Sequence, residues 1–265
     1  MHGMNFHRLS GAFKYYVFSR HRKGHGIHSP FVFDFVNTVL RKDIPPDVME
    51  IVNGVRKDMA ESSELLSVTD LGAGSQNKSS SQQRLSDISR RSTVRNRYGR
   101  VLHNIAARYN GRNILELGTS VGIGTLFLAL GAPASRIKSI EGCSQLVQIA
   151  KRNIVHCNID NIDVVTGDFD TQLDVLSETG FIPSMVFVDG NHRKEAVLKY
   201  FALLKELLEA GSVIVFDDIN YSCEMNEAWN EIKSDLQVSV SIDIFQMGFV
   251  FFRKGMVKQD FVIRY

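Results

Sequence analysis

The feature that most constrains the fold is a regular alternation, from Asn113 onward, of short apolar runs with longer amphipathic segments. The runs that predict strands are residues 114–117, 137–140, 163–166, 185–188 and 213–216. The segments that predict helices are residues 124–130, 144–156, 171–178, 194–209 and 224–236. Strands that alternate with helices of this length form parallel βαβ units. We therefore expect a doubly wound α/β sheet.

The alternation stops after the fifth unit. Residues 238–245 and 248–253 predict two further strands, separated only by Gln246 and Met247. Parallel strands need a long crossover, whereas a short turn joins antiparallel neighbours. We therefore expect a mostly parallel, seven-stranded, Rossmann-like sheet that ends in an antiparallel C-terminal hairpin, and we assign it to residues 113–265.

The preceding residues, 1–112, differ in charge and pattern. They carry 18 Lys and Arg against 9 Asp and Glu, while residues 113–265 carry 13 against 20. Helices are predicted at residues 30–41, 46–66, 82–91 and 94–109, with a Gly- and Ser-rich loop at residues 72–81. We expect residues 1–112 to form a helical cap that docks on the core and selects the substrate. The basic excess fits either an anionic partner such as RNA or a solvated appendage.

Several protein classes are disfavoured by what the chain lacks. No run of 18 apolar residues occurs, and residues 1–10 have no apolar core of a signal peptide. The three cysteines, Cys143, Cys157 and Cys223, lack the spacing of a zinc site or a disulfide framework. We predict a cytoplasmic protein with no membrane partner.

The most specific motif follows the first strand of the alternation. It reads Ile-Leu-Glu-Leu-Gly-Thr-Ser-Val-Gly-Ile-Gly-Thr over residues 114–125. Gly118, Gly122 and Gly124 allow the backbone to turn tightly against a ligand before the next helix. A dinucleotide fingerprint would need its third glycine at Phe127, so nicotinamide cofactors are disfavoured.

This motif resembles motif I of the class I S-adenosylmethionine-dependent methyltransferases. Glu141, 25 positions after Glu116, ends the second strand, where a carboxylate can accept both ribose hydroxyls. Asp168 and Phe169 end the third strand, where an adenine would lie. The predicted cofactor-binding residues are Glu116, Gly118, Thr119, Ser120, Gly122, Gly124, Glu141, Gly142, Asp168, Phe169 and Asp189.

Three carboxylates follow the fourth and fifth strands. Asp189 ends the fourth strand, and Asp217 and Asp218 end the fifth. Carboxyl ends of adjacent strands face one crevice, so these side chains should converge. Converging carboxylates repel each other unless they are protonated, hydrogen-bonded or bridged by a cation, and oxygen ligands suit Mg²⁺. A metal-free reading, with Asp189 close to the methionine end of the cofactor, stays open.

Residues 95–253 resemble the small-molecule O-methyltransferases of the catechol and macrolide-sugar kind, in which the fourth strand reads Val-Asp-Gly-x-His. The resemblance implies that Asp189, Asp217 and Asp218 hold a divalent metal that acidifies an acceptor hydroxyl. Asn191 stands where some relatives have a carboxylate base. His192 is then the candidate base, with Asp189 as the second catalytic residue, although a helix-capping role for His192 is equally open.

The chain also resembles uncharacterised methyltransferases common in Bacteroidetes, through His-Gly-Ile-His-Ser-Pro at residues 25–30 and the segment at residues 242–253. His25 and His28 are therefore candidates for an acceptor pocket, or they simply flank a helix start. The function we expect is O-methylation of a small hydroxylated molecule. An RNA (tRNA) methyltransferase and a non-catalytic S-adenosylmethionine-binding protein are the alternatives, and a homodimer is left open.

Overall fold

The computed structural model describes residues 15, 19, 28–69, 80–91 and 93–265. Most of the predicted loop at residues 72–81, and His25, lie outside the described residues. The chain forms two compact units. We call Thr38–Phe181 the middle unit, and Met1–Asn37 together with Ile182–Tyr265 the C-terminal unit.

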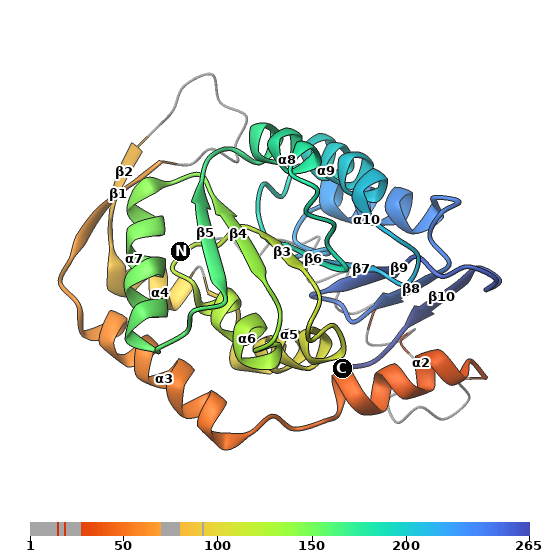
Figure 1. Ribbon diagram of the computed structural model, residues 1–265, viewed down its shortest axis with the longest axis horizontal. Helices are drawn as coiled ribbons and strands as arrows, with labels where there is room; N and C mark the ends of the chain where they lie inside the picture. The colour runs from red at the N-terminus through yellow and green to blue at the C-terminus, as the bar shows by residue number, and fades with distance from the viewer. Residues whose placement is uncertain (1–14, 16–18, 20–27, 70–79, 92) are drawn as a thin grey trace. The chain divides into compact units, whose positions relative to one another are not determined.

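The middle unit contains the first three strands of the predicted alternation. They are β3 (Ile114–Leu117), β4 (Ile137–Glu141) and β5 (Ile162–Thr166), which pair in parallel in that order (Figure 1). The helices that follow them are α6 (Ile123–Gly131), α7 (Ser144–His156) and α8 (Phe169–Glu178). Every residue of β3 is buried, as expected for a strand covered on both faces. The three carboxyl ends therefore lie along one edge of this part of the sheet.

Helix α5 (Asn96–Arg108) packs on α6 at very short range. A Cβ atom at Gly99 would lie 2.1 Å from the ring of Phe127, and one at Gly131 would lie 2.3 Å from the carbonyl oxygen of His103. Only glycine permits this approach of the two helices. The last part of residues 1–112 is therefore built into the core of the middle unit.

The remaining N-terminal elements of this unit differ from the predicted helices. Helix α3 (Pro46–Glu61) ends where Ser62 becomes extended, five residues before the predicted end. It is followed by β1 (Leu65–Thr69), which pairs antiparallel with β2 (Ser80–Arg84), and then by α4 (Leu85–Arg91). The backbone amide of Ser67 in β1 donates to Oε1 of Gln145 in α7, at 2.5 Å. This tertiary contact favours a strand where the local pattern predicted a helix.

The C-terminal unit contains five strands, in the order β10-β8-β9-β7-β6. They are β6 (Met185–Val188), β7 (Val213–Phe216), β8 (Val240–Asp243), β9 (Gly248–Phe251) and β10 (Gln259–Val262). β6 and β7 are parallel, whereas β9 runs antiparallel to both β7 and β8, so the predicted hairpin is present. β10 pairs in parallel with β8. With β10 the sheet has eight strands, whereas the sequence predicted seven. The residues of β10 are only partly buried and its first half is polar, so its sequence pattern did not predict a strand.

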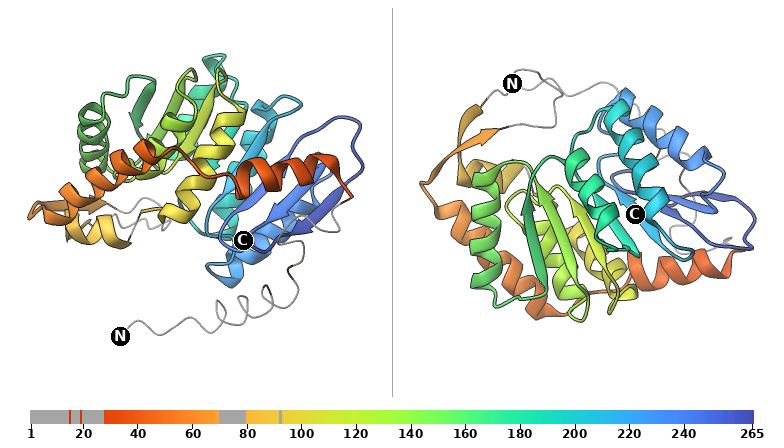
Figure 2. Two further views of the ribbon diagram at one scale, coloured as in Figure 1. Left: turned by 90° about the horizontal axis from the view of Figure 1, so that it is seen from below. Right: turned by 45° about the horizontal axis from the view of Figure 1, so that its top comes forward.

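Helices α2 (Pro30–Phe35), α9 (Lys194–Leu207) and α10 (Cys223–Ser234) belong to the same unit. α9 and α10 lie side by side (Figure 2). α2 begins with proline at its first position and continues as a π-helical turn, Val36–Leu40. The rings of Phe31 and Phe35 lie 4.9 Å from Phe251 and 5.1 Å from Phe249, respectively.

The described residues of the predicted cap are thus shared between the two units, and they include strands as well as helices. Docking of residues 1–112 as one cap stays a prediction. Among the described residues, the helices are too short or too polar to cross a membrane.

Candidate active site

The glycine motif forms a tight turn between β3 and α6. Gly118, Ser120 and Gly122 have φ angles of 107°, 48° and 88°, which lie in the left-handed region. A Cβ atom at Gly122 would lie 3.3 Å from Cβ of Ala150, so α7 comes close to the turn. No side chain caps α6 at Gly122, so its first amides are open to a bound group. The predicted tight turn is therefore formed, and its contact with a ligand stays a prediction.

Glu116 is wholly buried at the base of this turn. Its Oε2 accepts hydrogen bonds from the hydroxyls of Thr125, at 2.6 Å, and Ser139, at 2.5 Å. Its Oε1 has no hydrogen-bond partner among the described residues. Burial raises the pKa of this carboxyl to about 7, although the two hydroxyl donors oppose the rise. Glu116 therefore joins β3, β4 and α6, and is close to neutral below pH 7.

Glu141 lies beside the turn at the end of β4. Its carboxylate accepts the backbone N–H groups of Ser120 and Cys143, both at 2.9 Å. The side chain is half-buried, and a carboxylate oxygen can accept more than one hydrogen bond. The hydroxyl of Thr119 contacts that of Ser139 at 2.5 Å. The structure therefore brings Glu116 and Thr119 into one hydrogen-bonded group with Ser139, and Ser120 and Glu141 into a second group.

Asp168 and Phe169 follow β5. Oδ1 of Asp168 accepts the amide N–H of Thr171 at 2.9 Å, so Asp168 is the N-cap of α8. Phe169 is the first residue of that helix and is half-buried. The capping role explains why an acidic residue stands here without any ligand, and the adenine contact stays a prediction.

The predicted carboxylates gather in the C-terminal unit. Val188 pairs with Phe216 across β6 and β7, so Asp189 and Asp217 follow directly paired residues. The amide of Asp217 donates to the carbonyl of Val188 at 2.9 Å. The Asp217 side chain is buried, and burial, together with repulsion from Asp189 and Asp218, raises its pKa well above the usual range. The sheet register therefore produces the convergence that the sequence predicted.

His192 lies between two of these carboxylates. Its Nε2 is 3.8 Å from Oδ1 of Asp189 and 3.9 Å from Oδ2 of Asp218. These distances are too long for hydrogen bonds, so the two carboxylates flank the ring without bonding to it. The exposed ring of Tyr221 lies 5.8 Å from the His192 ring. Asn191 instead donates to the hydroxyl of Tyr200 at 3.1 Å, so its amide has a structural partner.

The sequence analysis missed one residue of this group, Gln246. Its Nε2 donates to Oδ1 of Asp217 at 3.2 Å and to Oδ1 of Asp218 at 2.5 Å. Phe216 pairs with Gly248 in the antiparallel register, which places the β8–β9 turn at the carboxyl end of β7. The predicted hairpin therefore already indicated that its turn, which carries Gln246, would lie near Asp217 and Asp218. We call Asp189, His192, Asp217, Asp218 and Gln246 the carboxylate cluster.

A divalent cation fits part of this cluster. Oδ1 of Asp217 and Oδ1 of Asp218 both contact one nitrogen, so they can converge on one point. Carboxylate oxygens are the donors that Mg²⁺ prefers, and one or two carboxylates commonly suffice. Within the part of the chain that the structure describes, no three His, Cys, Asp or Glu side chains are arranged to hold a metal ion. The pair Asp217 and Asp218 therefore fits a cation, while the third ligand, Asp189, stays a prediction.

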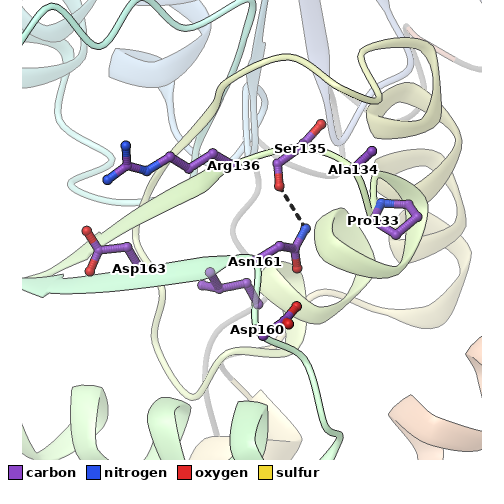
Figure 3. A pocket seen from close by; sticks show the side chains of 8 residues that line it. Pro133, Ala134, Ser135, Arg136, Asp160, Asn161 and Asp163 are labelled. Atoms are coloured by element: carbon purple, nitrogen blue, oxygen red, sulfur yellow. Dashed lines mark hydrogen bonds between the residues drawn. The ribbon is translucent and has the colours of Figure 1, made fainter.

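A polar cavity of about 410 Å³ lies elsewhere, at the amino ends of β4 and β5 (Figure 3). Arg136 and Asp160 line it, and Asn161 closes one side by donating to the carbonyl of Ser135 at 3.0 Å. It contains none of the predicted site residues, and it opens at the edge of the sheet opposite the glycine turn.

Comparisons with known proteins concern both the residues around the glycine turn and the carboxylate cluster. Residues 115–219 match the family model described as a methyltransferase domain, from Leu115 in β3 to Ile219 just after Asp218. The chain contains a methyltransferase domain. This domain includes every predicted cofactor and metal residue.

Two relatives of the methyltransferase domain are catechol O-methyltransferases. That of Mycobacterium tuberculosis is 31% identical over 123 residues, which cover 46% of this chain and 54% of the relative. That of Niastella koreensis is 30% identical over 124 residues, covering 46% and 55%. The chain thus spans about half the length of these curated relatives.

Solved structures show the fold. An O-methyltransferase from Bacillus cereus, described in complex with SAH, superposes with a TM-score of 0.54 at 20% identity, over 83% of this chain and 97% of that one. The methyltransferase domain therefore has the Rossmann-like class I fold that the sequence predicted, with the helices and the antiparallel hairpin in place.

Proposed function

We propose that this protein is an S-adenosylmethionine-dependent O-methyltransferase of a small hydroxylated molecule, acting in the cytoplasm with a divalent cation. The observation that carries the proposal is the carboxylate cluster, in which His192 stands between Asp189 and Asp218 beside a buried third carboxylate. Its residues up to Asp218 lie inside the range that matches the methyltransferase family model, and 123 residues of the chain are 31% identical to a catechol O-methyltransferase.

The middle unit would bind the cofactor. The glycine turn, with its open helix amides, supplies donors for polar groups, and Glu141 supplies acceptors for two ribose hydroxyls. The remaining members of the proposed binding set in this unit are Gly118, Thr119, Ser120, Gly122, Gly124, Gly142, Asp168 and Phe169, with the buried Glu116 at the base of the turn.

The C-terminal unit would prepare the acceptor oxygen. A phenol ionises with a pKa of about 10, so its proton must be removed for attack near neutral pH. A cation bound by Asp217 and Asp218, with Asp189 as the proposed third ligand, would lower the pKa of the hydroxyl. Nε2 of His192 would accept the proton, and the carboxylates of Asp189 and Asp218, at 3.8 and 3.9 Å, would stabilise the resulting imidazolium. The exposed Tyr221 ring would offer a planar acceptor a face on which to stack.

The test is methyl transfer from labelled S-adenosylmethionine to catechol, to the small-molecule fraction of a bacterial extract and to its RNA fraction. We expect labelled small-molecule products, lost in His192→Ala and retained in His156→Ala, a histidine that is exposed on α7. Label only in RNA, with binding that weakens steeply as salt rises, would replace the small-molecule proposal by RNA methylation. Cofactor binding without label in any fraction would indicate a non-catalytic binding protein.

A further inference from the structure

One side chain of the carboxylate cluster, Gln246, has no role in the mechanism proposed above. The amide nitrogen of Gln246 contacts Oδ1 of both Asp217 and Asp218, at 3.2 and 2.5 Å. An amide nitrogen carries two hydrogens, so it can donate to both oxygens at once. The amide oxygen cannot take this place, because it would face two carboxylate oxygens. Gln246 therefore supplies partial positive charge at the point where a cation shared by the two aspartates would lie.

The backbone holds Gln246 firmly in this place. In the β8–β9 turn, the amide of Ile244 donates to the carbonyl of Met247, and the amide of Phe245, whose φ is 72°, donates to Oδ1 of Asp243. The turn is also fastened to the loop after β7, where the amide of Ile219 donates to the carbonyl of Gln246 at 3.2 Å.

A second side-chain contact strengthens this attachment. Nδ2 of Asn220 donates to the carbonyl of Phe245 at 2.8 Å. The loop that carries Asp217 and Asp218 and the turn that carries Gln246 are therefore one hydrogen-bonded structure. The amide reaches the two carboxylates from a fixed backbone position.

We propose that Gln246 is a positioning residue that competes with the cation: its amide holds Asp217 and Asp218 together in the cation-free protein and must leave when a divalent cation binds. This inference rests on the cation site in the proposed function. The amide lowers the free energy of the cation-free state, because it donates to both carboxyl groups where they would otherwise face each other without a shared donor. These hydrogen bonds are lost when a cation binds, so the amide lowers the affinity of the site for the cation. The site therefore releases its cation readily.

The test measures Mn²⁺ binding to the full chain by calorimetry and by electron paramagnetic resonance. Gln246→Ala removes the donor, and Gln246→Met removes it while keeping the length of the side chain. We expect both variants to bind Mn²⁺ about tenfold more tightly than the wild type, equivalent to about 1.4 kcal/mol. We also expect a lower Tm without Mn²⁺ and a larger rise in Tm when it is added, which shows that the variants fold. Gln237→Ala, an exposed glutamine before β8, is the matched control and should behave as the wild type.

Two outcomes overturn the inference. Weaker Mn²⁺ binding in both variants would show that Gln246 acts as a ligand through its oxygen, and unchanged or absent binding would show that the amide does not compete. Asp217→Asn separates this result from the proposed function. If Asp217→Asn binds Mn²⁺ as tightly as the wild type, the cation site itself is wrong; if it loses binding while the Gln246 variants match the wild type, only the competition is wrong.

Discussion

Glu116 and Asp217 are both buried carboxylates at or near the carboxyl end of a strand, one in each unit, and burial raises the pKa of both. Their surroundings differ. Glu116 receives two neutral hydroxyl donors, whereas Asp217 stands next to two further carboxylates and receives the side-chain amide of Gln246 and the backbone amide of Asp218. The first environment suits a carboxyl that stays neutral and joins secondary structure elements. The second concentrates negative charge and therefore suits a bound positive charge.

The largest expected effect concerns the second environment. Chelation of divalent cations should reduce methyl transfer by about a hundredfold or more, because a cation that stabilises the developing oxyanion contributes several kcal/mol. Turnover with a chelator, and after Mg²⁺ is added back, measures this effect. Asp217→Asn should show the same loss without recovery. Full activity under chelation, with Asp217→Asn unimpaired, would show that Asp217 does not hold a catalytic cation. His192 would then be the remaining candidate for activating the acceptor.

The next effect concerns the first environment and depends on pH. The folded-state pKa of Glu116, about 7, lies above the ordinary value of 4.5, so burial penalises the ionised form. The contribution to stability is fully present below pH 4.5 and is lost as the pH rises through 7. Glu116→Gln has no ionisable group at this position and therefore avoids this loss. Between pH 5 and pH 8, its free energy of unfolding should rise by about 2 kcal/mol relative to that of the wild type.

Denaturant unfolding of the wild type and of Glu116→Gln at the two pH values measures this difference, in the absence of cofactor. Glu61→Gln, an exposed carboxylate at the end of α3, is the control and should leave the pH dependence unchanged. An identical pH dependence in wild type and Glu116→Gln would mean that Glu116 is ionised at little cost, like a surface carboxylate.

A smaller effect is expected at Glu141, the half-buried counterpart of Glu116 in the same unit. Glu141→Ala should weaken S-adenosylmethionine binding by about 1 to 3 kcal/mol, because charge-assisted hydrogen bonds are lost. Calorimetry measures it against Glu61→Ala, an exposed residue at the end of α3. If the affinity of Glu141→Ala equals that of the control, the ribose contact is misassigned, and Glu141 only fastens the turn through Ser120 and Cys143.

The smallest effect is expected at Gly122. Gly122→Ala should destabilise the protein by about 1 kcal/mol, because its φ of 88° disfavours any side chain and Ala150 leaves little room. Gly54→Ala is the matched control: no atom lies within 4 Å of its added Cβ, and alanine favours helix α3. Thermal unfolding should therefore show opposite shifts for the two variants. Equal shifts would mean that the turn relaxes without cost.

The contrast also explains which features could be predicted from sequence. Strand β3 and helix α7 coincide with their predictions, because their burial follows a local period. The convergence of Asp189 and Asp217 followed from parallel strand order alone. The role of Gln246 did not, because it depends on the antiparallel register of β9 and on a turn far along the chain. Strand β1 was missed for a similar reason, since its pairing with β2 and its contact to Gln145 are not local.

The close packing of α5 on α6 has a consequence for exchanging parts between related enzymes. Gly99 faces the ring of Phe127, and Gly131 faces the backbone at His103, so each helix is shaped to the other. A chimera that joins the N-terminal segment of one relative to the sheet of another at residue 113 would separate these partners. An exchange of the N-terminal segment therefore preserves this packing only when α5 and α6 move together, or when the exchange ends before Asn96.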